Sequence, residues 1–125
     1  MKILIVDDSL MDRKLMANLI QKSGILNPIL QAVDGEDALK VVSENYKDIC
    51  LILLDWQMPR LNGIEFMKGV VKVPEVASIP IIMVTASGTE DDQKFAREIN
   101  PNLAGYVVKP YKPDNLLSTI KPFLK

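Results

Sequence analysis

Five polar side chains stand at the ends of four separate apolar runs, and they carry the functional groups that phosphoryl transfer needs. They are Asp7, Asp8, Asp55, Thr85 and Lys109. An ionised aspartate can attack phosphorus and form an aspartyl phosphate, and a hydroxyl and an ammonium group can stabilise the phosphoryl oxygens. Three carboxylates a few ångströms apart would repel one another, and Mg²⁺ would relieve that repulsion. These residue types favour Mg²⁺-assisted phosphoryl transfer, provided that the fold brings them together.

The apolar runs before these residues are typical of buried β-strands. Ile49–Leu54 is apolar throughout and ends at Asp55. About four to eight consecutive apolar residues between turn signals indicate a strand covered on both faces, as in a parallel sheet. The same pattern predicts strands at Lys2–Val6, Pro28–Val33, Ile79–Thr85 and Gly105–Val108. The run Pro28–Val33 is less apolar than the central run Ile49–Leu54, so we expect its strand nearer the edge of the sheet.

Amphipathic helical patterns separate the predicted strands. They predict a helix between Ser9 and Gly24, then helices at Glu36–Asn45, from Gly63 to about Val73, at Glu90–Ile99 and from Asp114 to near the C-terminus. Pro122 is expected to fray or kink the last helix, and Pro74–Pro80 is predicted to be a loop.

Strands that alternate with amphipathic helices predict one α/β domain over residues 1–125. Its parallel sheet would have right-handed crossovers and helices on both faces, which is a three-layer sandwich. In such a sheet all strands end at the same edge, and open α/β sheets bind their ligands there. The five polar residues are therefore predicted to meet at the carboxyl edge.

Each of these residues also has a purely structural interpretation. An aspartate at a strand end often caps the next helix, and Asp7, Asp8 and Ser9 all suit the start of the first helix. Asp34 and Asp37 lie in a turn and at an exposed helix start, so we interpret them as structural. The joint pattern favours the functional interpretation, because chance would rarely place such residues at four strand ends.

Composition excludes several other classes of function. The net charge is −1 and no segment is strongly basic, which argues against direct nucleic-acid binding. No apolar stretch approaches the roughly 20 residues that span a bilayer, and a strand follows Met1 directly, so we expect a cytoplasmic protein without membrane insertion. The chain has no histidine, which excludes His-dependent nucleophilic catalysis and His-bound zinc. The single cysteine, Cys50, is interpreted as a core residue.

The sequence resembles the receiver domains of two-component response regulators, which are CheY-like, over essentially its whole length. The matching motifs are Ile3–Asp8, Val33–Leu39, Leu54–Gly63, Ile79–Ala86 and Gly105–Pro110. The resemblance implies a doubly wound (βα)₅ fold, flavodoxin-like, with the strand order 2-1-3-4-5. It also implies that the domain acts on no external substrate and catalyses only its own phosphorylation and dephosphorylation.

The resemblance implies a role for each residue of the site. Asp55 would accept a phosphoryl group from a sensor histidine kinase, a phosphotransfer protein or a small phosphodonor. Asp8 and Asp55 would ligate Mg²⁺ through their side chains, Asp7 mainly through water, and Gln57 through its backbone carbonyl. Lys109 would pair first with Asp55 and then with a phosphoryl oxygen.

The resemblance further implies a switch and an output surface. Thr85 would move toward the phosphoryl group, and Tyr106 would swing into the space that Thr85 vacates. The side chains of Gln57 and Ser87 would tune autodephosphorylation, and the Lys109–Pro110 bond would be cis. A downstream target protein would bind the face formed by the helix Glu90–Ile99, the strand Gly105–Val108 and the last helix, with the chain a monomer or a phosphorylation-dependent dimer. The segment Ile99–Gly105, before Tyr106, is slightly longer than the common form.

The sequence is compatible with three alternatives. An aspartate-nucleophile phosphatase of the haloacid dehalogenase type would carry Asp-x-Asp, but Gln57 stands where the second aspartate would be. A flavodoxin-like flavin binder would need a phosphate-binding loop rich in Ser, Thr and Gly after the first strand, where Asp7 and Asp8 would instead repel a phosphate unless a metal intervened. A pseudo-receiver would keep the fold for docking without phosphorylation, although the intact set of five residues argues against it.

Overall fold

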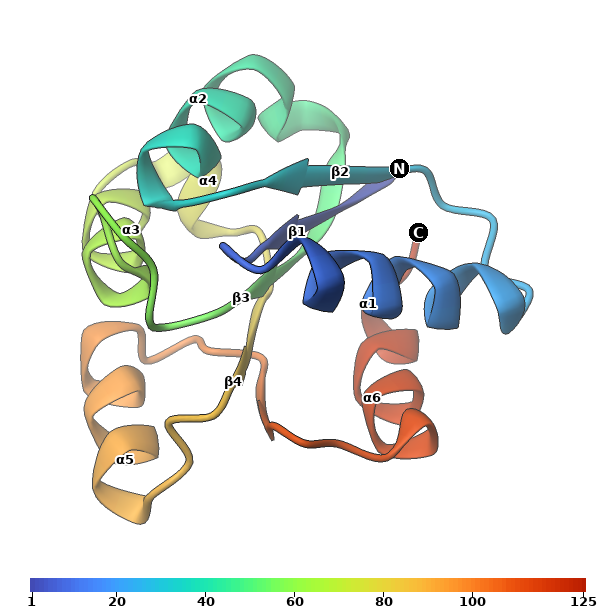
Figure 1. Ribbon diagram of the computed structural model, residues 1–125. Coiled ribbons are helices and arrows are strands. Elements are labelled where there is room, and N and C mark those ends of the chain that lie inside the picture. Colours follow the sequence, from blue (N-terminus) through green and yellow to red (C-terminus); the bar gives the residue numbers. More distant parts are fainter.

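The computed structural model describes residues 1–125 and contains a five-stranded parallel sheet between two layers of helices (Figure 1). The strands are β1 (Lys2–Val6), β2 (Ile29–Ala32), β3 (Ile49–Leu54), β4 (Ile81–Thr85) and β5 (Gly105–Val108). Their order is β2-β1-β3-β4-β5, and every neighbouring pair is parallel. The predicted fold class, strand order and edge position of the second strand are confirmed.

The helices divide between the two faces of the sheet. Figure 1 shows α1 (Leu10–Lys22) and α6 (Pro113–Ile120) together on one side. The other side carries α2 (Gly35–Asn45), α3 (Gly63–Val70), α4 (Pro74–Ala77) and α5 (Glu90–Ile99). Two 3₁₀ turns, η1 (Tyr46–Asp48) and η2 (Lys121–Phe123), follow α2 and α6. None of the helices combines the length and apolar character needed to cross a bilayer.

Two hydrophobic cores, one on each face, hold the sheet in place. Met16, Ile20, Leu116 and Ile120 from α1 and α6 pack on one face, and Phe66 is among the residues that fill the other. All six residues of β3 are buried, as expected for a central strand with helices on both sides. Cys50 is 3% exposed and belongs to the core, as predicted. Since the sheet is rigidly packed, the strand ends give the site a fixed frame.

The structure corrects several element boundaries, mostly at prolines. The predicted loop Pro74–Pro80 contains α4, because proline is well accepted at the first position of a helix. The preceding helix α3 ends at Val70 rather than Val73. Strand β4 begins at Ile81 rather than Ile79, since Pro80 has no N–H for the ladder. The last helix becomes the turn η2 at Pro122, which agrees with the predicted disruption.

Asp34 caps α2 and ties it to the loop after β3. Its Oδ1 accepts a hydrogen bond from the amide of Asp37 at 2.8 Å, and its Oδ2 accepts one from Nε of Arg60 at 2.8 Å. The bond from the Asp37 amide, with a smaller contribution from Arg60, lowers the pKa of this buried carboxyl below its usual value. Asp34 therefore has the structural role that the sequence indicated.

We expect Asp34→Ala to reduce the free energy of unfolding at pH 7 by about 1–2 kcal/mol, the usual cost of a lost helix cap. A carboxyl whose pKa is lowered by folding stabilises the protein above its unfolded-state pKa, so the difference from wild type should vanish as the pH falls through the folded-state pKa. Urea unfolding at a series of pH values from 7 down to the acid limit of the folded state measures both effects. Glu36→Ala, at an exposed neighbouring position, is the control, and an equal loss in both variants would contradict the prediction.

Candidate functional site

The carboxyl edge of the sheet brings three aspartates together. Asp7 and Asp8 follow β1, and Asp55 follows β3, which lies next to β1 in the sheet. Carboxylate oxygens of the three residues lie within 4.8 Å of one another. Asp7 is buried, Asp55 is half-buried and Asp8 is exposed. The three residues meet at one edge, as the strand-end pattern predicted, and they run from the interior of that edge out to solvent.

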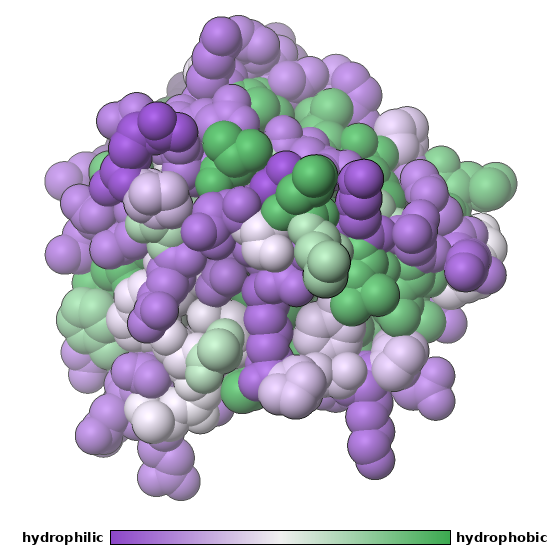
Figure 2. Space-filling view, viewed as in Figure 1, coloured by the Kyte–Doolittle hydropathy of each residue, from purple (hydrophilic) through white to green (hydrophobic).

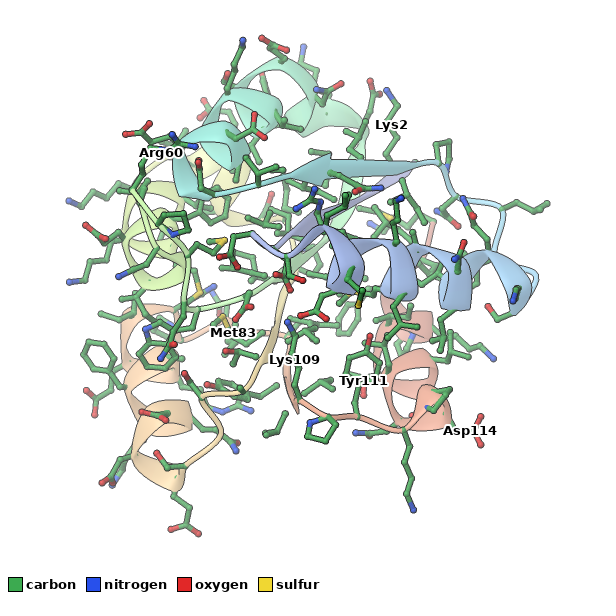
Figure 3. All side chains as sticks on the ribbon, in the orientation of Figure 1. Lys2, Arg60, Met83, Lys109, Tyr111 and Asp114 are labelled. Atoms are coloured by element: carbon green, nitrogen blue, oxygen red, sulfur yellow. The ribbon has the colours of Figure 1, made fainter.

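Lys109, which follows β5, reaches across the edge to this trio. Its Nζ lies 2.6 Å from Oδ2 of Asp7, 3.0 Å from Oδ2 of Asp12 and 3.2 Å from Oδ2 of Asp55. Figure 3 shows Lys109 near the middle of the view, between α1 and α5. One ammonium group thus serves three carboxylates, which leaves the site with an excess of negative charge.

Asp12 also belongs to this cluster, although no strand-end pattern predicts it. It lies in the first turn of α1, and its amide donates to Oγ of the N-cap residue Ser9 at 3.2 Å. A residue three positions after an N-cap points back toward the start of its helix, so an acidic residue there was a usable signal. Of the candidates Asp7, Asp8 and Ser9, it is Ser9 that caps α1.

Burial and pairing act in opposite directions on the charges of the site. Burial lowers the pKa of Lys109, but its hydrogen bonds to Asp7 and Asp12 and the charge of Asp55 outweigh this, so the net pKa lies above the usual value. Burial raises the pKa of Asp7, and the hydrogen bonds from Lys109 and the Ser9 amide only partly oppose that rise. Asp7 is therefore a carboxylate whose negative charge is incompletely compensated, which suits it to sit beside a second cation.

Asp55 is held by the loop that reverses the chain after β3. Its Oδ1 accepts a hydrogen bond from the amide of Trp56 at 2.7 Å, and the Trp56 carbonyl accepts one from the amide of Gly63 at 2.9 Å. A Cβ atom at Gly63 would lie 2.2 Å from the carbonyl oxygen of Asp55, so only glycine fits this turn. The loop therefore sets the direction of the Asp55 carboxylate.

The end of β4 and the loop that follows it contact the remaining predicted residues. Thr85 is buried, and its Oγ1 accepts a hydrogen bond from the Ser87 amide at 3.3 Å. Nε2 of Gln57 donates to Oγ of Ser87 at 3.4 Å, which joins this loop to the loop after β3. The amide of Lys109 donates to the Thr85 carbonyl at 2.9 Å. Thr85, Gln57, Ser87 and Lys109 are therefore linked through this one loop.

Tyr106 in β5 also contacts this loop. Its hydroxyl donates a hydrogen bond to the carbonyl of Ser87. Burial, together with the negative charges of Asp92 and Asp55, raises the pKa of Tyr106 to about 12, so the phenol keeps its proton at neutral pH. The hydroxyls of Thr85 and Tyr106 make no hydrogen bond to the aspartates, and the Lys109–Pro110 bond is cis.

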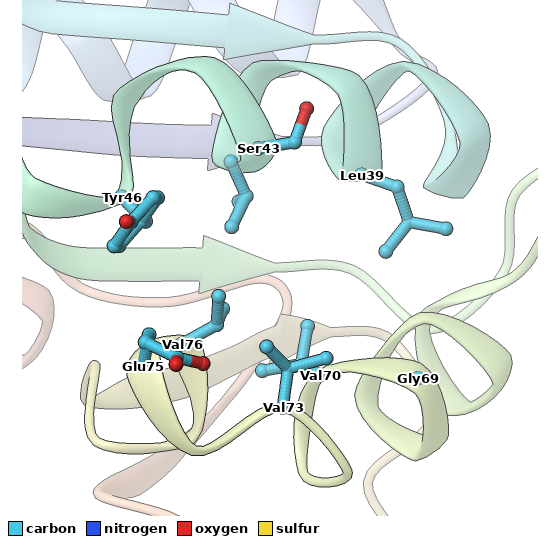
Figure 4. Close-up of a pocket in the computed structure, with 9 residues that line it drawn as sticks. Leu39, Ser43, Tyr46, Gly69, Val70, Val73, Glu75 and Val76 are labelled. Carbon is cyan, nitrogen blue, oxygen red and sulfur yellow. The ribbon is translucent and has the colours of Figure 1, made fainter.

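Two hollows differ in their relation to the site. One, of about 400 Å³, opens beside Lys109 and is lined by Asp12, Leu15, Ala86, Lys109, Pro110 and Tyr111. Figure 2 shows that apolar areas interrupt the hydrophilic surface on the side of the molecule seen in Figure 1. The other, of about 290 Å³, is an apolar groove between α2 and the α3–α4 segment, away from the acidic cluster (Figure 4). Only the first is lined by charged residues of the site, Asp12 and Lys109.

A parallel sheet in the order 2-1-3-4-5, with an aspartate trio and a lysine at its carboxyl edge, defines a receiver-type signalling domain. The family model "Response regulator receiver domain" matches residues 3–121. The chain belongs to this family, the receiver domains of two-component response regulators.

Individual relatives agree with this assignment. A chemotaxis protein CheY homolog of Campylobacter jejuni is 33% identical over 124 residues, which cover 99% of this chain and 92% of the relative. The phosphate regulon transcriptional regulatory protein PhoB of Escherichia coli is 32% identical, and the match covers 99% of this chain but 52% of PhoB. The structure of chemotaxis response regulator CheY4 of Vibrio cholerae superposes with a TM-score of 0.85 at 29% identity, covering 98% of both chains.

Proposed function

We propose that this receiver domain is a phosphoacceptor and that Asp55 takes the phosphoryl group. The donor would be a sensor histidine kinase, a phosphotransfer protein or a small phosphodonor. The observation that carries the proposal is the position of the Asp55 carboxylate, inside an acidic cluster and 3.2 Å from the ammonium of Lys109. A carboxylate in that position can act as nucleophile next to a fixed cation.

The donor set of the site fits Mg²⁺. It consists of carboxylate oxygens, which are hard ligands, and the three aspartates lie close enough to share one ion. Asp8 and Asp55 would bind Mg²⁺ through their side chains, Asp7 mainly through water and Gln57 through its carbonyl. When bound, Mg²⁺ would neutralise carboxylate charge and hold a phosphoryl oxygen near Asp55.

The chain's own groups account for the transfer step. A carboxylate oxygen of Asp55 forms the new O–P bond while the bond between phosphorus and the donor's leaving atom breaks, and the electron pair leaves with the donor. Lys109 already contacts Asp55 and can follow the developing charge onto a phosphoryl oxygen. The hollow beside Lys109 exposes the ammonium side of the cluster, and the Asp55 side chain itself is 12% exposed.

The switch would act through the loop after β4. Thr85 would leave the Ser87 amide and donate its hydroxyl to a phosphoryl oxygen, and Tyr106 would give up its bond to Ser87 and swing inward. The changed face of α5, β5 and α6 would bind a downstream target protein, either as a monomer or as a phosphorylation-dependent dimer. Gln57 and Ser87, which already touch, would tune autodephosphorylation. We place this cycle in the cytoplasm.

The test is the intact mass of the protein after incubation with acetyl phosphate. We expect a gain of a single phosphoryl group in the presence of Mg²⁺, none in the presence of EDTA, and loss of the group with time after the donor is removed. Peptide mapping should place it on Asp55. No gain under any condition would contradict the proposal and leave a pseudo-receiver that acts by docking.

An activity assay on the same purified protein distinguishes a receiver domain from a phosphatase. An aspartate-nucleophile phosphatase turns over phosphate monoesters many times, whereas a receiver hydrolyses only its own aspartyl phosphate. We expect no multiple turnover of p-nitrophenyl phosphate, and sustained turnover that depends on Asp55 would favour the phosphatase.

A further inference from the structure

Arg13 is a buried arginine without an acidic partner. Arg13 lies in α1 and is 7% exposed. The only ion pairs in the chain are those of Arg60 with Asp34 and of Lys109 with Asp7, Asp12 and Asp55. Burying a guanidinium without a counter-ion is costly, and an apolar residue would pack α1 on the sheet at lower cost. The arginine therefore calls for an explanation other than packing.

Its hydrogen bonds lead to the acidic cluster through the backbone. Nη1 of Arg13 donates to the carbonyl oxygen of Asp7 at 2.7 Å, and this bond is buried. Nε donates to Oε1 of Gln31 on the edge strand β2 at 3.0 Å. The planar guanidinium thus joins the end of β1, the helix α1 and the strand β2 with bonds in fixed directions.

The carbonyl of Asp7 belongs to the peptide plane that joins Asp7 to Asp8. The amide of Asp7 donates to the carbonyl of Ala32 at 3.1 Å, and Oδ1 of Asp7 accepts from the Ser9 amide at 2.9 Å. These two bonds fix Asp7 itself. The bond from Arg13 fixes the plane that follows, and this plane determines where the chain places Asp8, whose side chain is exposed and has no hydrogen bond of its own.

We propose that Arg13 is a positioning residue, which orients the Asp7–Asp8 peptide so that both carboxylates face one Mg²⁺ ion. This inference rests on the Mg²⁺ site of the proposed function. It makes a prediction of definite sign, because the positive charge of Arg13 would by itself repel Mg²⁺. Loss of the charge alone would tighten Mg²⁺ binding, whereas loss of the positioning would weaken it.

Arg13→Gln separates these two effects. The variant should bind Mg²⁺ about 10- to 100-fold more weakly, the usual cost of losing a group that orients metal ligands. Affinity is obtained from the rise in melting temperature with Mg²⁺ concentration, measured against each variant's own metal-free state. Titration of Trp56 fluorescence gives an independent value, since the Trp56 amide contacts Asp55. Neither readout depends on phosphorylation.

Two further variants keep the test decisive. Lys14→Gln removes a neighbouring positive charge from an exposed position of α1, and its Mg²⁺ affinity should stay within about twofold of wild type. Gln31→Ala, also at an exposed position, removes one anchor of the guanidinium and should weaken Mg²⁺ binding several-fold. If circular dichroism shows that Arg13→Gln is unfolded, Gln31→Ala decides the question.

The outcomes separate this inference from the proposed function. If wild type binds Mg²⁺ and Arg13→Gln binds it equally or more tightly, the positioning role is wrong and the phosphoacceptor proposal stands. If only Gln31→Ala can be measured, an affinity equal to that of wild type overturns the inference in the same way. If wild type shows no Mg²⁺ binding, the metal site of the proposed function fails and the inference fails with it.

Discussion

Asp55→Asn should gain no phosphoryl group from acetyl phosphate and Mg²⁺, whereas Asp12→Asn should still gain one. Asparagine keeps the size of the side chain and can still accept the hydrogen bond from the Trp56 amide, but its neutral amide is not a nucleophile for phosphorus. The expected result is therefore complete loss of the mass increase with little change in fold. Intact-mass spectrometry over a time course measures the effect directly.

Asp12 is the matched control, because it shares the lysine with Asp55. Its carboxylate lies 3.0 Å from Nζ of Lys109, compared with 3.2 Å for Asp55, and its side chain is 43% exposed. Each substitution removes one of the carboxylates that contact the ammonium group of Lys109. If Asp55→Asn still gains a phosphoryl group, another residue is the acceptor. If Asp12→Asn gains none although Asp55 is intact, the charge of the cluster decides the reaction.

The strand ends were predictable because periodicity is strong in a parallel sheet. Strands buried on both faces are continuous apolar runs, so Ile49–Leu54 and Ile79–Thr85 stand out without any knowledge of the fold, although the second strand starts at Ile81. Parallel pairing then places all carboxyl ends at one edge, which is why residues as distant as Asp7 and Lys109 could be predicted to meet. Their contact at 2.6 Å confirms that argument.

Other features of the site depend on contacts that sequence patterns do not encode. Asp12 and Arg13 both lie in a turn of α1 that periodicity describes only as amphipathic, and whether each side chain reaches the site depends on how α1 packs on the sheet. The helix α4 was missed because proline ends helices and also begins them. The hydrogen bond that Thr85 Oγ1 accepts from the Ser87 amide likewise depends on the shape of the loop after β4, which no sequence pattern specifies.

Lys109→Met should lower both the stability of the protein and the rate of its phosphorylation, and Mg²⁺ should restore only the stability. Without Mg²⁺ we expect the free energy of unfolding at pH 7 to fall by about 3 kcal/mol, since the buried Asp7 loses its partner. The raised pKa of Lys109 means that its stabilising contribution is fully present below the usual lysine value of about 10.4 and is lost only as the pH rises through the folded-state pKa. A comparison at pH 7 therefore captures the whole effect.

Mg²⁺ should restore much of this stability, because it can neutralise the carboxylate charge that Lys109 neutralises in the wild type. The rise in melting temperature with Mg²⁺ should thus be larger for Lys109→Met than for wild type, while the rate of phosphorylation by acetyl phosphate should fall at least about 100-fold. Lys112→Met is the control, since it removes the same charge from an exposed site nearby and should change neither quantity. A Lys109→Met variant that is phosphorylated at the wild-type rate would show that Lys109 only stabilises the acidic cluster, and charge stabilisation of the phosphoryl group would then have to come from Mg²⁺ alone.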